Sequence, residues 1–232
     1  MILLDIFHRD KLNYTRTTVI ITMLETLSTT VRTRIETAES FPYELQTEII
    51  RKSIHLLIAF VPFFASVDIV FTMTLLGGGI IFYSISEMLR YEGKQVLIIS
   101  YLTAIAARKR DRGKFILGPV TLGLGAMLAL LFYPEPAASL AIYALAFGDG
   151  FSSVFGKMWG KRVIPLTGGK TYVGSITCFL TVFIVSFRII QNIPIAFSLA
   201  LITMLLEAVP TGDMDNILIP AGTGFLAYRL LL

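Results

Sequence analysis

Hydrophobic residues recur in long, weakly charged runs along most of the chain. After residue 48, apolar segments follow at 49–66, 67–86, 96–107, 114–133, 137–156, 173–190, 195–209 and 217–232. A helix needs about 20 apolar residues to cross a hydrocarbon core of roughly 30 Å. The twelve residues of 96–107 would give a helix of about 18 Å, which is too short to cross. The other segments predict an all-α, polytopic membrane protein with about seven transmembrane helices.

The first 48 residues follow a different pattern. They hold seven of the sixteen acidic residues and five basic ones around a short, threonine-rich apolar patch, TVIITMLETLSTTV. This pattern predicts an amphipathic, interfacial helix or helical hairpin lying on the membrane. The start, MILLDIFHRD, lacks the basic region and cleavage site of a signal peptide. We therefore expect an interfacial region at 1–48 and a transmembrane domain at 49–232.

The composition agrees with a membrane location. The chain is 55% hydrophobic with a mean hydropathy of +0.74, which is too apolar for a soluble domain. Its net charge of +4 comes from residues that flank apolar spans, so orientation in the membrane explains it better than nucleic-acid binding. One cysteine, Cys178, excludes an intramolecular disulfide, and two widely separated histidines do not favour a zinc site.

Basic residues predict the orientation of the spans. If Arg51 and Lys52 lie inside and 96–107 stays at the interface, the loops at 87–95, 108–114, 157–172 and 210–216 also lie inside. That side then holds eighteen of the twenty Lys and Arg residues, with Arg188 and Arg229 at outer ends. Any active site is therefore expected on the cytoplasmic face.

An acidic residue interrupts one predicted span. Asp149 lies in AFGDGFSSVFGKMWGKRVIPLTGGKTYVGS, residues 146–175, seven residues before the expected inner end of its helix. A carboxylate at a depth of about 10 Å usually holds a cation, metal or proton. Ser152, Ser153 and Gly156 share its helix face. Asp149 is therefore a site candidate, and the alternative is a packing seam of small residues in which it is paired internally.

Three glycine–lysine pairs follow in one predicted loop: Gly156-Lys157, Gly160-Lys161 and Gly169-Lys170. Glycine lets backbone N–H groups turn toward phosphate oxygens, and lysine supplies a positive charge. Lys170-Thr171 resembles the end of a P-loop, but Ile164 stands where that motif needs its first glycine. The loop therefore predicts a polyanion site without a Walker A motif. The alternative is a basic loop attracted to anionic lipid.

Two further groups of polar residues border predicted spans. In LLEAVPTGDMDNILIP, Glu207 ends one helix, and Asp213, Asp215 and Asn216 lie in the next turn. Such hard oxygen ligands suit Mg²⁺, although Asp and Asn also cap helices. In RKSIH at 51–55 and SEMLR at 86–90, charged residues one turn apart would form a second wall of an anion site or anchor helix ends.

Together these segments resemble the family of CTP-dependent lipid kinases that includes dolichol kinase, phytol kinase and the CTP-using diacylglycerol kinase. Five motifs occur in the family's order: RKSIH, SEMLR, AFGDGFSSVFGKMWGK at 146–161, GGKTYVGS at 168–175 and EAVPTGDMDNILIP at 207–220. The resemblance implies transfer of the γ-phosphate of CTP to the hydroxyl of a membrane lipid alcohol, with Mg²⁺. The family commonly has two adjacent acids before the asparagine, whereas Met214 separates the two acids here.

The resemblance also implies a role for each group. Asp149, Lys170 and Glu207 would be catalytic. Mg²⁺ ligands would come from Asp149, Glu207, Asp213, Asp215 and Asn216. The nucleotide would be bound by Arg51, Lys52, His55, Gly148, Lys157, Gly160, Lys161, Gly169, Lys170 and Thr171. Asp149→Asn is expected to leave membrane insertion near normal but abolish transfer.

The expected lipid is a polyprenol, dolichol, phytol or diacylglycerol, which would reach the site laterally between helices because its tail cannot leave the bilayer. Two alternatives remain open at this point. One is a cytidylyltransferase that forms a CDP-lipid. The other is a membrane transporter, which the almost wholly apolar outer halves of the spans disfavour.

Overall fold

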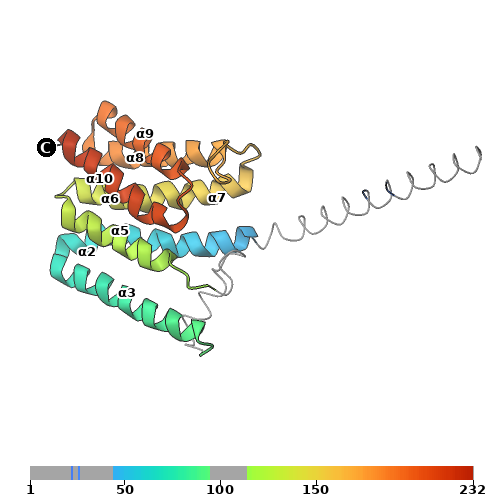
Figure 1. Ribbon diagram of the computed structural model, residues 1–232. Helices are drawn as coiled ribbons and strands as arrows, with labels where there is room; N and C mark the ends of the chain where they lie inside the picture. The colour runs from blue at the N-terminus through green and yellow to red at the C-terminus, as the bar shows by residue number, and fades with distance from the viewer. Residues whose placement is uncertain (1–21, 23–25, 27–43, 95–113, 232) are drawn as a thin grey trace, which may run out of the picture. The chain divides into compact units, whose positions relative to one another are not determined.

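The computed structural model describes residues 22, 26, 44–94 and 114–231, and the regular elements in these residues are helices (Figure 1). The chain divides into two units, Met1–Glu44 and Leu45–Leu232. The predicted interfacial helix lies almost wholly outside the described residues, and 96–107 lies entirely outside them. The second unit contains the helices of the bundle.

The helices of this unit follow the predicted apolar segments closely. Residues 44–56 are helical and continue through η1 (Leu57–Phe60) into α2 (Val61–Val67). The remaining elements are α3 (Ile69–Tyr91), α5 (Gly118–Phe132), α6 (Ala137–Tyr143), η3 (Ala144–Asp149), α7 (Gly150–Trp159), α8 (Tyr172–Ile190), α9 (Ile193–Ala208), η4 (Gly212–Met214) and α10 (Asp215–Leu231). Figure 1 shows them side by side, with the α7–α8 loop at one end of the bundle and the C-terminus at the other.

The protein is an all-α membrane protein. In the part of the chain that the structure describes, four continuous helical stretches are long and apolar enough to span a bilayer: Glu44–Val67, Ile69–Tyr91, Ala137–Trp159 and Tyr172–Ile190. The helices α5 and α9 are apolar but shorter, at 15 and 16 residues, and α10 has 17. Seven spans therefore remains a prediction, since it requires these three shorter helices to cross as well.

Local sequence signals set several helix ends. Asp68 caps α3 by accepting a hydrogen bond from Phe71 N at 2.9 Å, and Asn192 caps α9 by accepting one from Ile195 N at 3.1 Å. Asp and Asn are favoured at this position because their side chains satisfy amides that have no partner inside the helix. Proline lies in the first turn of α2, α5 and α9, where its missing N–H costs nothing.

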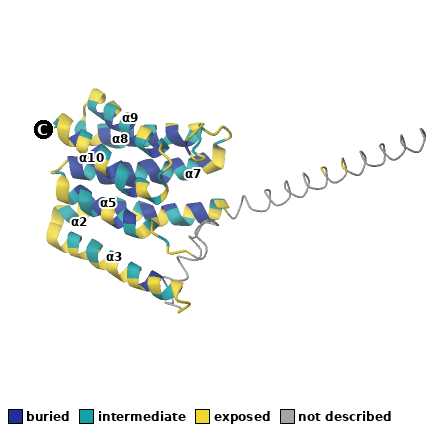
Figure 2. Cartoon of the chain, viewed as in Figure 1, coloured by how far each residue is buried: buried dark blue, intermediate teal, exposed yellow. Residues whose placement is uncertain are grey.

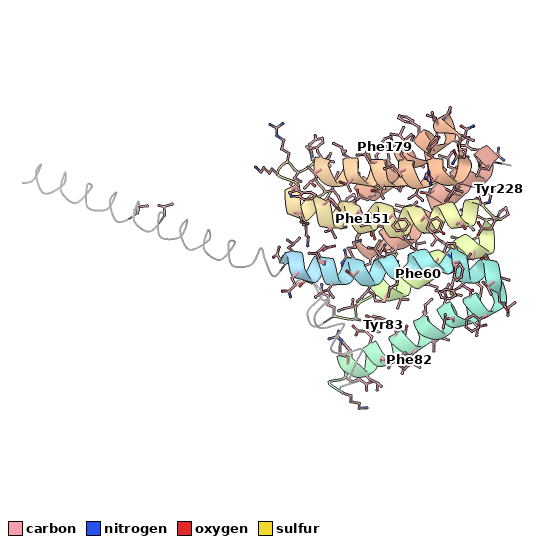
Figure 3. The ribbon with its side chains drawn as sticks, turned by 180° about the vertical axis from the view of Figure 1, so that it is seen from behind. Phe60, Phe82, Tyr83, Phe151, Phe179 and Tyr228 are labelled. Carbon is pink, nitrogen blue, oxygen red and sulfur yellow. The ribbon has the colours of Figure 1, made fainter. Side chains whose placement is uncertain are left out.

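The continuous helix formed by α6, η3 and α7 lies at the centre of the bundle. In its most apolar stretch 61% of the residues are buried, against 11–28% in the other three long helices (Figure 2). Small residues let neighbouring helices approach it. A Cβ on Gly148, for example, would lie 2.9 Å from Val182 of α8. Exposed aromatic rings lie on the outside, where Phe60 of η1 and Phe82 of α3 are labelled in Figure 3. The most enclosed helix is thus the one that carries Asp149.

Candidate active site

A pocket of about 570 Å³ gathers residues from four separate stretches of the sequence. The stretches are the helix at 44–56, the η3–α7 helix, the loop and helix start at 167–174, and residues 207–215. Eight predicted site residues line it: Arg51, Asp149, Lys157, Gly169, Lys170, Thr171, Glu207 and Asp215. Motifs separated by more than 150 residues therefore meet in one cavity.

The other predicted residues lie outside the pocket lining. Lys52 and His55 are buried beside Asp149. Gly148 packs against α8, and a Cβ on Gly160 would collide with the Gly156 carbonyl oxygen at 2.2 Å. Lys161 is exposed. Asp213 and Asn216 also lie off the lining, so of the two turn acids it is Asp215 that faces the cavity.

Asp149 is the centre of a buried charge cluster. Lys52 donates to Asp149 Oδ2, and both side chains are 2% exposed. His55 Nε2 lies 3.5 Å from the same oxygen and 3.1 Å from the Leu145 carbonyl oxygen. Ser153 Oγ lies 3.4 Å from Oδ1, so that oxygen retains capacity for another hydrogen bond. The pairing with Lys52 explains how a carboxylate is tolerated inside an apolar helix.

The backbone around Asp149 is unusual. Residues Ala144–Asp149 form a π-helical segment within the otherwise α-helical stretch. Such segments are rare and are frequently found at functional sites, because the wider turn changes the direction of the following side chains. The helix also continues to Trp159, ten residues beyond Asp149, rather than ending near residue 156 as expected. Asp149 therefore lies deeper along its helix than the sequence predicts.

Glu207 is held on one side only. Its Oε1 accepts from Lys170 Nζ at 2.6 Å and from Ser152 Oγ at 3.0 Å. Its Oε2 is buried and has no hydrogen-bond partner among the described residues. Two donors thus fix the carboxylate through one oxygen and leave the other bare. Burial alone would lower the pKa of Lys170, but Asp149 and Glu207 outweigh it and raise that pKa, so the ammonium stays charged.

Glu48 organises two cations of the pocket, and sequence reasoning missed it. Its carboxylate accepts from Arg51, one turn away, and from Lys157 Nζ at 2.8 Å on α7. Glu48 is 1% exposed. The available signal was its i+3 spacing from Arg51 at the start of a span, but the sequence could not show that Lys157 lies opposite.

The loop between α7 and α8 folds back on itself. Ile164 N donates to the Lys170 carbonyl at 2.8 Å, and Tyr172 N donates to the Arg162 carbonyl at 3.2 Å. Gly168 and Gly169 have φ angles of 66° and 106°, which favour glycine. Thr171 caps α8 by accepting from Gly174 N at 3.2 Å. The loop thus presents Lys170 and the positive end of α8 to the pocket, as anion sites commonly do.

Two predicted polar groups hold helices together. Asn216 donates to the Gly118 carbonyl at 3.2 Å and to Thr121 Oγ1 at 3.0 Å, which ties α10 to α5. Glu87 pairs with Arg90 as expected, at 2.6 and 2.7 Å, and also accepts from Ile116 N at 2.8 Å. Neither Glu87 nor Arg90 lines the pocket, so the second anion wall expected from SEMLR is not found there.

The acids do not form a preassembled metal cage. Within the described residues, no three His, Cys, Asp or Glu side chains are close enough together to hold a metal ion. Mg²⁺ often takes only one or two protein carboxylates and shares its other positions with phosphates and water. The bare Oε2 of Glu207, with Asp215 on the same lining, fits a Mg²⁺ ion that arrives with a polyphosphate.

Fold and site define an all-α membrane protein with a mixed acidic and basic pocket suited to an anionic ligand. Comparison with known proteins shows distant similarity to proteins named phytol kinase. The chain is 24% identical over 147 residues to probable phytol kinase 1, chloroplastic, of Oryza sativa subsp. japonica, covering 56% of this chain and 47% of that protein. It is 27% identical over 101 residues to the phytol kinase of Synechocystis, covering 39% and 43% of the two chains.

The predicted resemblance to lipid alcohol kinases is confirmed at this distance. Phytol kinase 1, chloroplastic, of Arabidopsis thaliana is 22% identical over 147 residues, which is 48% of that protein. The chain thus spans about half the length of the curated relatives it matches. No family model matches the chain, and no solved structure matches it.

Proposed function

We propose that this protein is a CTP-dependent kinase that transfers the γ-phosphate of CTP to the hydroxyl of a membrane lipid alcohol. The observation that carries the proposal is the geometry of Glu207. A buried carboxylate with one bare oxygen adjoins Lys170 in a pocket that also holds Arg51, Lys157 and Asp149. This arrangement supplies both signs of charge that a metal–nucleotide complex requires.

Each wall of the pocket has a distinct task in this reaction. The triphosphate is held by Arg51, Lys157 and Lys170, together with backbone amides of the α7–α8 loop. Glu207 Oε2 and Asp215 would hold Mg²⁺, which would offset charge on the transferring phosphoryl group. Phosphoryl transfer requires mainly positioning and charge neutralisation, and the pocket's cations serve both.

The acceptor side is assigned to Asp149. The lipid hydroxyl hydrogen-bonds to Asp149 Oδ1, whose contact with Ser153 is long at 3.4 Å. As the lipid oxygen bonds to the γ-phosphorus, its proton passes to this carboxylate, the bond from the γ-phosphorus to the β–γ bridging oxygen breaks, and CDP leaves. Lys52 keeps Asp149 ionised beforehand. A loose transition state demands only a weak base.

Isotope position tests the reaction class. Purified protein in detergent would be incubated with phytol, dolichol, undecaprenol or diacylglycerol and with CTP labelled at the α- or γ-phosphate. We expect lipid labelling from γ-labelled CTP alone, and a rate with ATP at least tenfold lower. Phytol is the first alcohol to test because the relatives carry its name. Labelling from the α position would replace the kinase with a cytidylyltransferase, and no labelling from either would reject both.

We also propose that the pocket opens to the cytoplasm. The support is the positive-inside pattern. The C-terminal end of α7 and the α7–α8 loop, which border the pocket, carry four basic residues: Lys157, Lys161, Arg162 and Lys170. Lys161→Cys and Gln191→Cys place thiols near opposite ends of α8, both at exposed positions, while the native Cys178 is buried. In intact cells an impermeant reagent should label position 191 and spare 161. The reverse pattern would invert the orientation.

A further inference from the structure

Three residues that line the pocket each carry a buried polar atom without a partner in the described part of the chain. Of the buried side-chain nitrogen and oxygen atoms that have no hydrogen-bond partner among the described residues, Arg51 Nε, Glu207 Oε2 and Thr211 Oγ1 belong to residues of the pocket lining. Buried polar atoms are normally paired, so each such atom needs a reason. In the proposed reaction Arg51 binds the triphosphate and Glu207 would bind Mg²⁺. The reaction as proposed gives no role to Thr211.

The backbone of Thr211 is already engaged, which isolates its hydroxyl as the unused group. Thr211 N donates to the Val209 carbonyl at 2.9 Å, and the Thr211 carbonyl accepts from Met214 N at 3.4 Å. Gly212, with a φ of 70°, lets the chain turn directly after it. The turn is therefore folded by its own backbone, and the hydroxyl adds nothing to that folding.

The Thr211 turn packs against the loop that carries Lys170. A Cβ built on Gly168 would lie 3.0 Å from Pro210 Cβ, so the two segments touch one residue from Thr211 and two residues from Lys170. A ligand that contacts Lys170 would therefore also be near the Thr211 turn.

The charge of the pocket indicates the kind of ligand atom. The lining carries three cations, Arg51, Lys157 and Lys170, beside the carboxylates of Glu48, Asp149, Glu207 and Asp215. Arg51 Nε can only donate. Phosphate oxygens only accept, so they suit both an arginine N–H and a threonine hydroxyl acting as donor. An ionised carboxylate such as that of Glu207 has no proton to donate to a phosphate oxygen.

On the basis of the proposed function, we infer that Thr211 contacts the phosphate donor, with its hydroxyl donating to a phosphate oxygen of the nucleotide. Thr211→Val removes the hydroxyl and nearly keeps the shape. Binding of Mg²⁺–CTP to the full chain in detergent should weaken about tenfold, the loss expected for a hydrogen bond to a charged acceptor. Thr211→Ser should bind within about twofold of wild type, because one hydroxyl donor remains.

A threonine outside the pocket gives the matched control. Thr181 on α8 donates to the Thr177 carbonyl within its own helix, so Thr181→Val should leave CTP binding unchanged. Thr211→Ala provides a second hydroxyl-free variant if the valine variant does not fold.

The outcomes separate this inference from the proposed function. If hydroxyl-free variants bind CTP like wild type, and wild type transfers phosphate to lipid, the Thr211 contact is wrong and the kinase stands. If wild type neither binds CTP nor transfers phosphate, the kinase is wrong, and tripolyphosphate then serves as the probe. Weaker tripolyphosphate binding in Thr211→Val, but not in Thr211→Ser, would still support the anion contact, and equal binding would overturn it.

Discussion

Two lysine–carboxylate pairs lie at one pocket and differ in which of their atoms remain available to a ligand. Lys52 and Asp149 join the helix at 44–56 to the central helix, and both side chains are 2% exposed. Lys170 and Glu207 join the α7–α8 loop to α9, with Lys170 24% exposed and one Glu207 oxygen unpaired. In the first pair, the closed pair, Lys52 is buried between two helices and only Asp149 Oδ1 remains available to a ligand. The second is open to a ligand.

The difference separates the free-energy cost of burying a charge from the part that the charge plays in the reaction. A charge buried without a partner is strongly unfavourable, so each member of the closed pair depends on the other. In the open pair, Lys170 projects from a loop and has partial access to solvent, so losing its partner costs less folding energy. Damage to the closed pair should therefore act on folding and on activity, whereas loss of the Glu207 charge from the open pair should act on activity.

The largest expected effect is that of Asp149→Asn. From sequence alone this variant is expected to insert normally, but the structure shows that it would leave Lys52 buried without a counter-charge. Breaking a buried pair in this way costs about 3–5 kcal/mol, so we expect a lower thermal midpoint as well as loss of transfer. The double variant Lys52→Met/Asp149→Leu should recover the midpoint but not the activity. Normal stability in Asp149→Asn would show that the pair is not closed.

Glu207→Gln should remove activity and spare the fold. Glutamine keeps the shape and an oxygen for Lys170 and Ser152, but it loses the charge that would hold Mg²⁺. We expect turnover to fall at least about 10³-fold, or roughly 4 kcal/mol in the barrier, with little change in thermal midpoint. Glu135→Gln, at an exposed position, is the control. Full activity in Glu207→Gln would show that Glu207 Oε2 does not bind Mg²⁺ and that the residue has only a structural role.

Lys170→Ala tests the cation of the open pair. A lost charge contact to a transferring phosphoryl group is commonly worth more than about 1.4 kcal/mol, so turnover should fall at least tenfold. Lys161→Ala removes the same charge from an exposed position off the pocket lining and should stay within twofold of wild type. Equal losses in the two variants would indicate a general electrostatic effect of the loop.

The turn acids should separate in the same assay. Asp215 lines the pocket and Asp213 does not, so Asp215→Asn should lower turnover about tenfold, the loss expected when one charge contact is removed. Asp213→Asn should lower turnover less than about threefold, which is less than half the loss in Asp215→Asn on a logarithmic scale. Titrating Mg²⁺ should show a higher requirement in Asp215→Asn alone. The opposite order would assign the metal to Asp213.

Sequence predicted the helices well because apolar runs are local signals. The structure brings Asp149, Lys170 and Glu207, which the resemblance implies are catalytic, to the lining of one pocket. The sequence could not predict which residues far apart in the chain contact one another. Nothing near residue 149 shows that Lys52 neutralises it, and nothing near Asn216 shows that it donates to α5. Such contacts depend on helix packing, which the apolar pattern does not specify.

The smallest expected effect belongs to Ser152, which orients the open pair. Its hydroxyl lies 3.0 Å from Glu207 Oε1 and 3.2 Å from the Asp149 carbonyl oxygen, and the residue is 2% exposed. Ser152→Ala leaves Lys170 as the donor to Oε1, so Glu207 keeps its charge but is oriented less firmly. A single hydrogen bond contributes roughly 1 kcal/mol net, so we expect turnover to fall about fivefold with unchanged CTP affinity.

Ser175 offers a matched control for this variant. It is also a buried serine, on α8, but its hydroxyl has no partner among the described residues, so Ser175→Ala should leave turnover unchanged. A fall in turnover for Ser152→Ala alone would show that the hydrogen bond from Ser152 to Glu207 Oε1 is needed to orient Oε2. Equal turnover in both variants would mean that Lys170 orients Glu207 by itself, and the open pair would then need no third residue.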